Sequence, residues 1–319
     1  MSTYYQIFGG KVNVVSADPS NPIEGQMWYN TTTELLKYRA VNVGTWASGG
    51  NMGTGRRILA AAGTQTSGLG FGGYVTSQGG KNNTEEYDGT SWTAGGNLGT
   101  AVYLHGGAGT QTAAASFGGS NVPRTQTEEY DGTSWTGGGT MNTGRYALGG
   151  TGLQTAALAF GGVTTTDVTA TEEYDGTTWT NGGNLATARR AFGSAGTQTS
   201  GLGFGGYPPA AGSTPTEEYD GTSWTAGGNL NTARRGSSGC GTQTLALGFG
   251  SLSSTGTSAA TEQYNGTSWT NATSMATARG YLGGCGTQTA GLAFGGGTTN
   301  ATEEFTGGNV AVTRTVTAS

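Results

Sequence analysis

Large apolar residues recur along this chain at regular distances and are separated by stretches of glycine, serine and threonine. Within each period, one short segment places an apolar residue at every second position, as in Leu202-Gly203-Phe204. Alternation with a period of two is typical of a β-strand with one buried face. No segment carries the helical period of an amphipathic helix, so the pattern predicts an all-β protein.

Three markers indicate that the chain is built from six similar units. A tryptophan, a phenylalanine followed by two small residues, and a Gly-Thr-Gln-Thr type of turn each occur six times, at steps of 43 to 46 residues. Self-similarity at such a fixed period is the signature of a repeat architecture. The tryptophans are Trp46, Trp92, Trp135, Trp179, Trp224 and Trp269.

Each unit reads as four short strands. The Asp220-Gly221 pair between the last two strands of one unit is a strong hairpin signal. Four antiparallel strands in a period of roughly 40 to 50 residues are typical of a propeller blade. A β-solenoid is the rival architecture, although its coils are usually shorter. In the unit that spans 189–225, we expect strands at 189–195, 200–206, 216–219 and 222–225.

Propeller blades pack face to face, so the few large residues of each unit are expected to fill the layer between neighbouring blades. The glycines between them allow the backbones to approach closely. One tyrosine and one tryptophan per complete unit are the predicted structural residues. They are Tyr87 and Trp92, Tyr130 and Trp135, Tyr174 and Trp179, Tyr219 and Trp224, and Tyr264 and Trp269.

The number of blades depends on how the two ends of the chain pair. A strand centred on tyrosine or phenylalanine occurs seven times, from Tyr38 to Phe305, whereas the complete hairpin occurs six times. Residues 26–46 read as three strands and residues 310–318 as one or two more. We expect seven blades, with one closing blade from both termini, because closure removes free sheet edges. The alternative is six blades, closed by the strand of Trp46 alone.

The repeat resembles the kelch repeat, whose fold is a β-propeller. The residues that carry the resemblance in one unit are Phe204-Gly205-Gly206, Tyr219-Asp220, Trp224 and Thr232-Ala233-Arg234. The similarity extends over about residues 35–305. The turn that follows the tyrosine, Asp-Gly-Thr-Ser, is slightly shorter than the usual kelch turn.

Composition and charge exclude several classes of function. Charged residues make up 10% of the chain, only three are lysines, and no basic stretch is present, so we expect no nucleic-acid partner. No apolar run approaches the length of a membrane span, and Met1 to Gly10 do not read as a signal peptide. Cys240 and Cys285 lie one repeat apart, which favours two small buried residues over a disulfide.

Residues for catalysis and metal binding are scarce. The single histidine, His105, stands at a position that we assign to Phe, Tyr or Leu in other units, and no Cys/His cluster exists for a metal. A Glu pair recurs in five units and Gln263 replaces its second glutamate in the other one, whereas catalytic residues usually occur once. We therefore expect no catalytic residue, no metal site and no cofactor.

An arginine recurs at one position of five units, and Val102 takes that position in the second unit. One interpretation is an Arg–Glu pair that braces each blade junction, which fixes geometry more than it adds stability. The other is a ring of arginines at one mouth of the propeller, which would bind an acidic sugar or a partner carboxylate. These candidate ligand-binding residues are Arg56, Arg145, Arg189, Arg234 and Arg279.

The loops between the second and third strands differ from unit to unit, while the strands repeat. A constant scaffold with variable loops on one face is typical of a binding protein. Tyr74 and Tyr207 are the candidate aromatic platforms in these loops, which suit sugar hydroxyls or adaptable protein contacts. Neutral drift of solvent-exposed loops explains the same variation.

Residues 22–33 and Leu36-Lys37 resemble a short module found near the start of bacteriophage fibre and appendage proteins. Glycine- and threonine-rich kelch-like arrays after such a module resemble predicted structural proteins of aquatic phages. The resemblance implies a virion protein, a tail or head fibre or a capsid decoration, made in the host cytoplasm. Residues 1–25 would be an extended arm that docks on other virion proteins, and residues 26–319 would form the propeller.

Under this hypothesis, the protein is a non-enzymatic propeller that binds a host-surface glycan or protein. An enzyme that acts on glycans is one alternative, and it predicts a unique carboxylate or His/Tyr cluster in one mouth. A cellular kelch-type adaptor for a protein partner is the other, and it predicts an attached oligomerisation domain. The residues leave open whether the chain forms a homo-oligomer.

Overall fold

The structure is a computed structural model that describes residues 12–20, 26–42, 44–120, 123–253, 256–307 and 310–316. The chain divides into two compact units, Met1–Gly44 with Gly307–Ser319, and Thr45–Thr306. Strands are the only regular elements of the described residues, which contain no helix that could cross a membrane. The expectation of an all-β protein is therefore confirmed.

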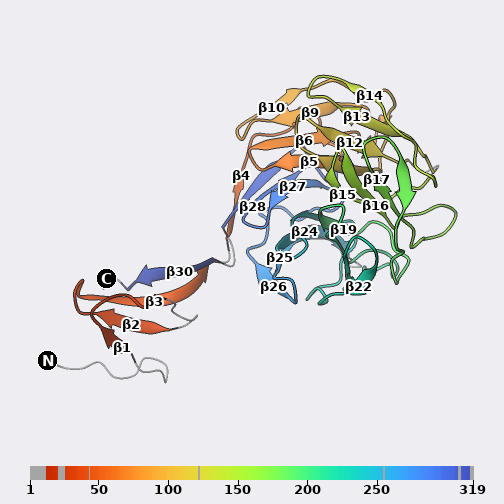
Figure 1. The fold of residues 1–319 in the computed structure, drawn as a ribbon. Helices are drawn as coiled ribbons and strands as arrows, with labels where there is room; N and C mark the ends of the chain where they lie inside the picture. Colours follow the sequence, from red (N-terminus) through yellow and green to blue (C-terminus); the bar gives the residue numbers. More distant parts are fainter. Residues whose placement is uncertain are drawn as a thin grey trace. The chain divides into compact units, whose positions relative to one another are not determined.

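The unit Thr45–Thr306 consists of six four-stranded antiparallel sheets, which follow one another along the chain and are consistent with a propeller-like fold (Figure 1). We number these sheets one to six. The first is β5 (Ala60–Thr64), β6 (Ser67–Phe71), β9 (Thr84–Tyr87) and β10 (Trp92–Ala94). The second is β11 (Gly106–Gly109), β12 (Ala114–Phe117), β13 (Thr127–Tyr130) and β14 (Trp135–Gly137). The third is β15 (Gly149–Leu153), β16 (Ala156–Phe160), β17 (Thr171–Tyr174) and β18 (Trp179–Asn181).

The remaining sheets repeat this order of strands. The fourth is β19 (Gly193–Gly196), β20 (Gly201–Phe204), β21 (Thr216–Tyr219) and β22 (Trp224–Ala226). The fifth is β23 (Ser238–Gly241), β24 (Ala246–Ser253), β25 (Gly256–Tyr264) and β26 (Trp269–Ala272). The sixth is β27 (Gly283–Thr287), β28 (Ala290–Phe294), β29 (Thr302–Thr306) and β4 (Thr45–Ser48). A small hairpin of β7 (Tyr74–Val75) and β8 (Gly79–Gly80) lies in a loop of the first sheet.

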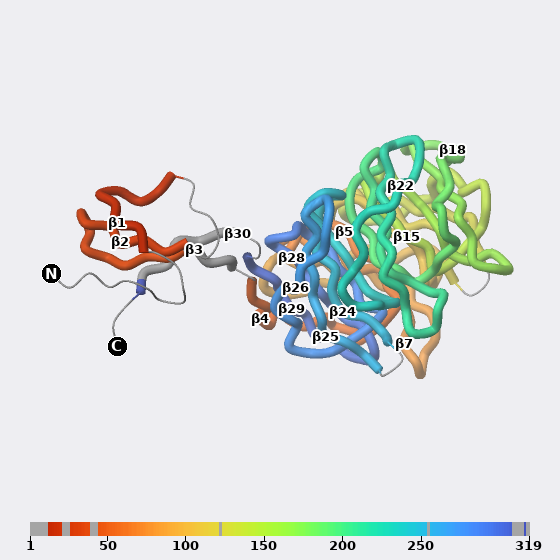
Figure 2. Tube along the Cα trace, turned by 90° about the horizontal axis from the view of Figure 1, so that it is seen from below, coloured from red at the N-terminus to blue at the C-terminus, as the bar shows by residue number. Residues whose placement is uncertain are grey.

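The sixth sheet joins two segments that are far apart in the sequence. Strand β4 precedes the first repeat, yet it pairs antiparallel with β29, with Trp46 opposite Phe305. Figure 2 shows β4, in red, beside the blue strands of the C-terminal repeat. The first strands of the six sheets then contact one another in a cycle, which returns from β27 to β5.

A closed ring of backbone hydrogen bonds links all six sheets at one end of this cycle. At one equivalent position per sheet, the backbone φ is between +50° and +57°. The N–H of each of these residues donates to the C=O of the equivalent residue one sheet earlier. The donor–acceptor pairs are Ile58 to Tyr281 (2.7 Å), Leu104 to Ile58 (3.0 Å), Ala147 to Leu104 (2.7 Å), Ala191 to Ala147 (2.9 Å), Gly236 to Ala191 (2.6 Å) and Tyr281 to Gly236 (2.7 Å).

The strands near the two termini do not enter this cycle. They form a separate sheet in the other compact unit, in the order β1 (Asn13–Val15), β2 (Met27–Asn30), β3 (Leu35–Asn42) and β30 (Val310–Thr315). Strands from both termini pair with each other in this separate sheet, as β3 does with β30, whereas the sixth sheet is completed by the pairing of β4 with β29. The boundary between the units lies at Gly44 and Thr45 rather than at residues 25 and 26. Of the expected arm, residues 1–11 and 21–25 lie outside the described residues.

In five of the six sheets, the backbone requires the two glycines that follow the repeat phenylalanine. In the fourth sheet, Gly205 and Gly206 have φ of +70° and +108°, which is the region that favours glycine. A Cβ atom on Gly206 would also lie 2.9 Å from the Cβ of Phe192 in the preceding loop. The Gly-Gly pair therefore ends the second strand and lets the connection into the same sheet pass close behind it.

The core lies between neighbouring sheets rather than in one centre. Each repeat tyrosine is fully buried, and each repeat tryptophan donates its Nε1–H to a threonine of the preceding sheet, at 2.9–3.1 Å. The glutamine of each Gly-Thr-Gln-Thr turn also reaches back one sheet. Gln198, for example, donates to the carbonyl oxygens of Ala157 and Tyr174. The repeated residues are thus the contacts that join one sheet to the next.

Candidate ligand-binding face

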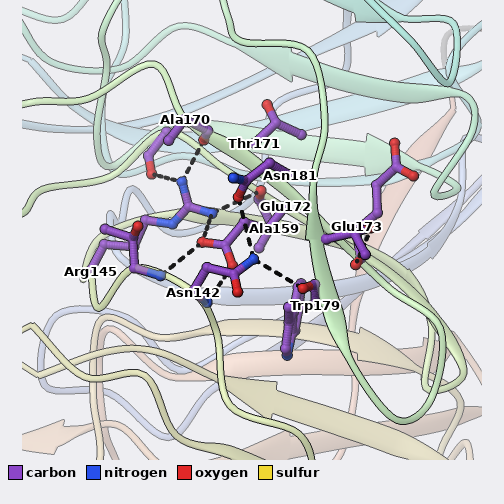
Figure 3. Close-up of polar contacts among 12 residues, drawn as sticks. Asn142, Arg145, Ala159, Ala170, Thr171, Glu172, Glu173, Trp179 and Asn181 are labelled. Carbon is purple, nitrogen blue, oxygen red and sulfur yellow. Dashed lines mark hydrogen bonds and ion pairs between the residues drawn. The ribbon is translucent and has the colours of Figure 1, made fainter.

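The five recurring arginines lie in buried ion pairs. Arg145 shows the arrangement, which Figure 3 displays: its guanidinium donates to Glu172 Oε1 at 3.1 Å and to the carbonyl oxygens of Ala159, Gly161 and Ala170. The corresponding pairs are Arg56–Glu85, Arg189–Glu217, Arg234–Glu262 and Arg279–Glu303. Each arginine comes from the loop before a sheet, so the pair ties that loop to the third strand of the sheet.

This placement corrects the idea that these arginines form a ligand-binding ring. Arg56, Arg145, Arg189, Arg234 and Arg279 are at most 3% exposed. Burial lowers the pKa of Arg56 and of Arg145 to about 10, while the adjacent glutamate acts in the opposite direction, so both remain charged at neutral pH. The arginines have the bracing role that was the other interpretation.

The second glutamate of each pair makes a different contact. It points to the other side of the strand, as Glu173 does in Figure 3, and accepts a hydrogen bond from the tyrosine of the following sheet. The Tyr219 hydroxyl lies 2.5 Å from Glu173 Oε1. A Cβ atom on Gly182 would lie only 2.6 Å from the same hydroxyl, so glycine makes room for it. Glutamate, tyrosine and glycine therefore act as one set at five of the six junctions.

The sixth junction changes all three members of this set together. Gln263 replaces the glutamate, Phe305 replaces the tyrosine and Ala272 replaces the glycine. Phe305 has no hydroxyl to donate, so a buried carboxylate at position 263 would lack its partner. Ala272 packs against the cluster that contains Phe305, where the other junctions hold the hydroxyl. The neutral amide of Gln263 needs no hydroxyl donor, and the methyl group of Ala272 occupies space that the absent hydroxyl of Phe305 leaves free.

We expect Gln263→Glu alone to lower the free energy of unfolding by about 2–3 kcal/mol, because the new carboxylate is buried without a donor. The triple variant Q263E/A272G/F305Y should recover most of this loss, since it rebuilds the set of the other junctions. Urea unfolding of the wild type, the single variants and the triple variant measures the effect. Strict additivity of the three single effects would contradict the coupling.

The two ends of the repeat unit carry different loops. The turns between strands one and two and between strands three and four meet at one end, as at Gly89 and Thr66, where an added Cβ would lie 3.4 Å from the threonine Cβ. The variable loops and the connections between sheets therefore lie at the opposite end, because the strands are antiparallel. We call this opposite end the loop face.

Tyr207 lies at the centre of a basic cluster on the loop face. The guanidinium carbon of Arg190 lies 3.9 Å from the centre of the Tyr207 ring, and that of Arg235 lies 5.9 Å from it. Arg190 also forms an ion pair with Asp167 at 2.7 Å. Tyr207 and Arg235 are partly exposed. A flat ring between two cations thus faces solvent.

Tyr74 takes the equivalent position in the first sheet. Arg57 lies 5.6 Å from the centre of its ring, and the ring of Tyr103 lies 5.1 Å away in an edge-on arrangement. The two tyrosines that the sequence singled out therefore both lie beside an arginine. The arginine in each case is the residue directly after a buried one, Arg57 after Arg56 and Arg190 after Arg189.

Charge is segregated between the two ends of the unit. The cations outside the buried pairs all come from the loop face, which carries one acidic loop residue, Asp167. They are Arg57, Lys81, Arg124, Arg190 and Arg235. The opposite turns carry Asp88, Asp131, Asp175 and Asp220 and no cation. Backbone N–H groups of Ser91 and Thr90 hold the pKa of Asp88 at about 2, so that end stays negative.

A cavity of about 240 Å³ runs between the first strands of the six sheets. Its lining is mainly glycine and alanine and includes Cys240 and Cys285. Both thiols are free and buried, as expected, and burial raises the pKa of Cys285 to about 12. No group of three His, Cys, Asp or Glu residues suited to a metal ion occurs in the described residues.

Sequence reasoning missed the second arginine of each Arg-Arg pair. Neighbouring residues of an extended chain point to opposite sides, so only one of the two can enter the buried pair. The signal was present in the dipeptides Arg56-Arg57, Arg189-Arg190 and Arg234-Arg235.

No protein-family model and no curated protein matches this chain.

Proposed function

We propose that this protein is a non-enzymatic binding protein whose loop face recognises an anionic glycan on a cell surface. The observation that carries the proposal is the concentration, on one face, of arginines outside the buried pairs beside partly exposed tyrosines. In this proposal the main glycan contact is made by Tyr207 and two arginines. The guanidinium carbon of Arg190 lies 3.9 Å from the centre of the Tyr207 ring, and that of Arg235 lies 5.9 Å from it. Arg57 and Tyr74 provide a second glycan contact.

The chemistry of these groups supports a charged sugar. Arginine presents a planar fork of N–H donors that matches carboxylate, sulfate and phosphate oxygens. A tyrosine ring offers a flat apolar surface and a hydroxyl, which suit the two kinds of surface on a sugar ring. Serine, threonine and asparagine are frequent in the surrounding loops and supply further hydrogen bonds.

We further propose that the six sheets are the blades of a six-bladed, kelch-like propeller that belongs to a bacteriophage appendage. The cyclic backbone hydrogen bonds and the pairing of β4 with β29 support six blades. The resemblance of residues 22–37 to a module of phage fibre proteins supports the proposal that the protein is part of a virion. In this proposal the N-terminal arm contacts other virion proteins, and the loop face contacts the host.

Binding to sulfated dextran, with unsubstituted dextran as the neutral counterpart, tests the glycan proposal. We expect saturable binding of the sulfated polymer that weakens with salt. R190A, R235A and Y207A should each weaken it about tenfold, which corresponds to about 1.4 kcal/mol. Lys37→Ala removes one positive charge from the other unit and serves as the matched control.

Two results would count against this function. Equal losses for Lys37→Ala and for the loop-face variants would reduce the binding to overall charge. Equal binding of both dextrans would show that the arginines do not recognise the sulfate groups. Mass spectrometry of purified phage particles tests the virion part separately, because an appendage must be present in a fixed ratio to the major capsid protein.

A further inference from the structure

The second sheet keeps the complete acceptor set of the buried arginine site but has no arginine. Val102 stands at the position of the arginine and is 5% exposed. Glu128 stands at the position of the paired glutamate. The carbonyl groups of Ser116, Gly118 and Gln126 correspond to those that accept from the guanidinium in the first sheet, namely Gly70, Gly72 and Asn83.

The backbone around this position matches that of the other sheets, so the substitution leaves the local fold in place. Gly118 N–H donates to Gln126 O at 3.0 Å, as Gly72 does to Asn83 in the first sheet. Glu128 Oε2 accepts from the N–H of Gly99 at 2.7 Å. In all six sheets this carboxylate oxygen accepts from a backbone N–H.

The other carboxylate oxygen is the one that differs. In five sheets Oε1 accepts from an arginine Nη2, with the carbonyl acceptors beside it. Among the described residues, Glu128 forms no ion pair. The residues that carry the corresponding acceptors line a cavity of about 10 Å³, and Glu128 is partly exposed there. The cavity is lined by Val102, Ser116, Gly118, Gln126 and Glu128, together with Thr100 and Arg124.

Size and chemistry define what this cavity can hold. A volume of about 10–15 Å³ accommodates one group of the size of a water molecule. One carboxylate oxygen and three carbonyl oxygens are all acceptors, so the matching group is a compact cation with N–H donors. We propose that this pocket of the second sheet binds an ammonium group, either the free ion or the end of a primary amine.

Arg124 lowers the affinity of the pocket for a cation. It lies on the wall of the cavity, and its Nη1 donates to Ala101 O at 3.2 Å rather than to Glu128. Its positive charge disfavours any cation in the pocket and so limits the affinity. Removing this charge by Arg124→Gln should tighten the binding of ammonium.

Thermal unfolding of the full chain at constant ionic strength tests the proposal, which does not depend on glycan binding. Ammonium chloride should raise the Tm of the wild type in a saturable manner, relative to tetramethylammonium chloride, which has the same charge and no N–H donor. Ethylamine distinguishes the two sources: a response to ethylamine shows that a lysine or amino-sugar end can enter, and a response to ammonium alone restricts the site to the free ion.

Two variants of the site separate specific binding from a general salt effect. Val102→Arg supplies the guanidinium from the chain itself, and Glu128→Gln removes the charge, so both should lose the ammonium response. Arg145→Val recreates the same site in the third sheet and should gain a second response. An equal ammonium response in the wild type, V102R and E128Q would overturn the proposal. A potassium response equal to that of ammonium would overturn the requirement for N–H donors.

Discussion

Trp179→Ala is expected to lower the free energy of unfolding by about 3–5 kcal/mol, the range found for buried aromatic residues. Trp179 is 4% exposed and lies between the second and third sheets. Its ring stacks on Tyr174 with centroids 4.8 Å apart and meets Phe117 edge-on at 5.0 Å. Its Nε1–H donates to Thr127 Oγ1 and to Gly139 O. Alanine would leave a cavity and an unpartnered threonine hydroxyl.

Chemical denaturation at neutral pH measures this loss. Leu153→Ala is the control, because Leu153 is 54% exposed and its truncation should change stability by less than about 0.5 kcal/mol. A similar small change for Trp179→Ala would mean that the layer between sheets is not the core. A loss confined to the neighbouring sheets would instead mean that the six repeats do not unfold together.

His105→Leu is expected to stabilise the protein, and most strongly at acid pH. His105 is buried in the layer between the first and second sheets, with its ring 5.5 Å from that of Phe71. Neither ring nitrogen has a hydrogen-bond partner among the described residues. Four of the five equivalent residues are apolar, so an apolar side chain fits this position; they are Leu59, Leu148, Phe192 and Leu282, and the fifth is Ser237. Leucine should add about 1–3 kcal/mol at neutral pH, because it removes a buried polar group without a partner.

The pH dependence follows from the pKa of the histidine. Burial, with a smaller contribution from the charge of Arg56, lowers the pKa of His105 from 6.5 to about 3. Between these values the unfolded chain binds a proton that the folded chain does not bind. Stability is therefore lost as the pH falls from 6.5 towards 3, by about 1.4 kcal/mol per pH unit and about 5 kcal/mol in total.

Urea unfolding of the wild type and of His105→Leu at pH 7 and at pH 4 checks this expectation. The difference in unfolding free energy between the two proteins should be about 3 kcal/mol larger at pH 4 than at pH 7. Parallel pH profiles would show that His105 is accessible to protons in the folded state. The carboxylates titrate in both proteins, so their contribution cancels in the difference.

The arginine site shows where sequence reasoning reached its limit. The positions of Arg145 and Glu172 were visible as repeated residues, and pairing between them was one of two interpretations. The choice required the burial of the guanidinium, which depends on the connection before the sheet folding back over Gly161 and Ala170. A repeated charge can equally line a solvent-filled mouth, and the one-dimensional pattern is the same in both cases.

The ends of the chain show a second limit. The strand of Trp46 and the strands at 27–42 and 310–315 all have the local pattern of β-strands. Which of them completes the last sheet depends on pairing between residues more than 250 positions apart, such as Trp46 and Phe305. Local propensity is nearly equal for each choice, so contacts across the whole chain decide it.

The sequence by itself determined the number and order of the strands in each repeat, the turns and the residues that join neighbouring repeats, because these depend on short-range rules of period, turn chemistry and glycine. The strand bounds were less accurate: the first strand of the fourth sheet, expected at 189–195, spans Gly193–Gly196. It also contained the matched change of Gln263, Ala272 and Phe305 at one junction. Only the tertiary structure decided which strand completes the sixth sheet, which arginine of each pair is partly exposed, and that Val102 leaves a set of acceptors without a guanidinium. The physical reason is that burial, pairing and charge compensation belong to residues distant in sequence, and only folding brings them together.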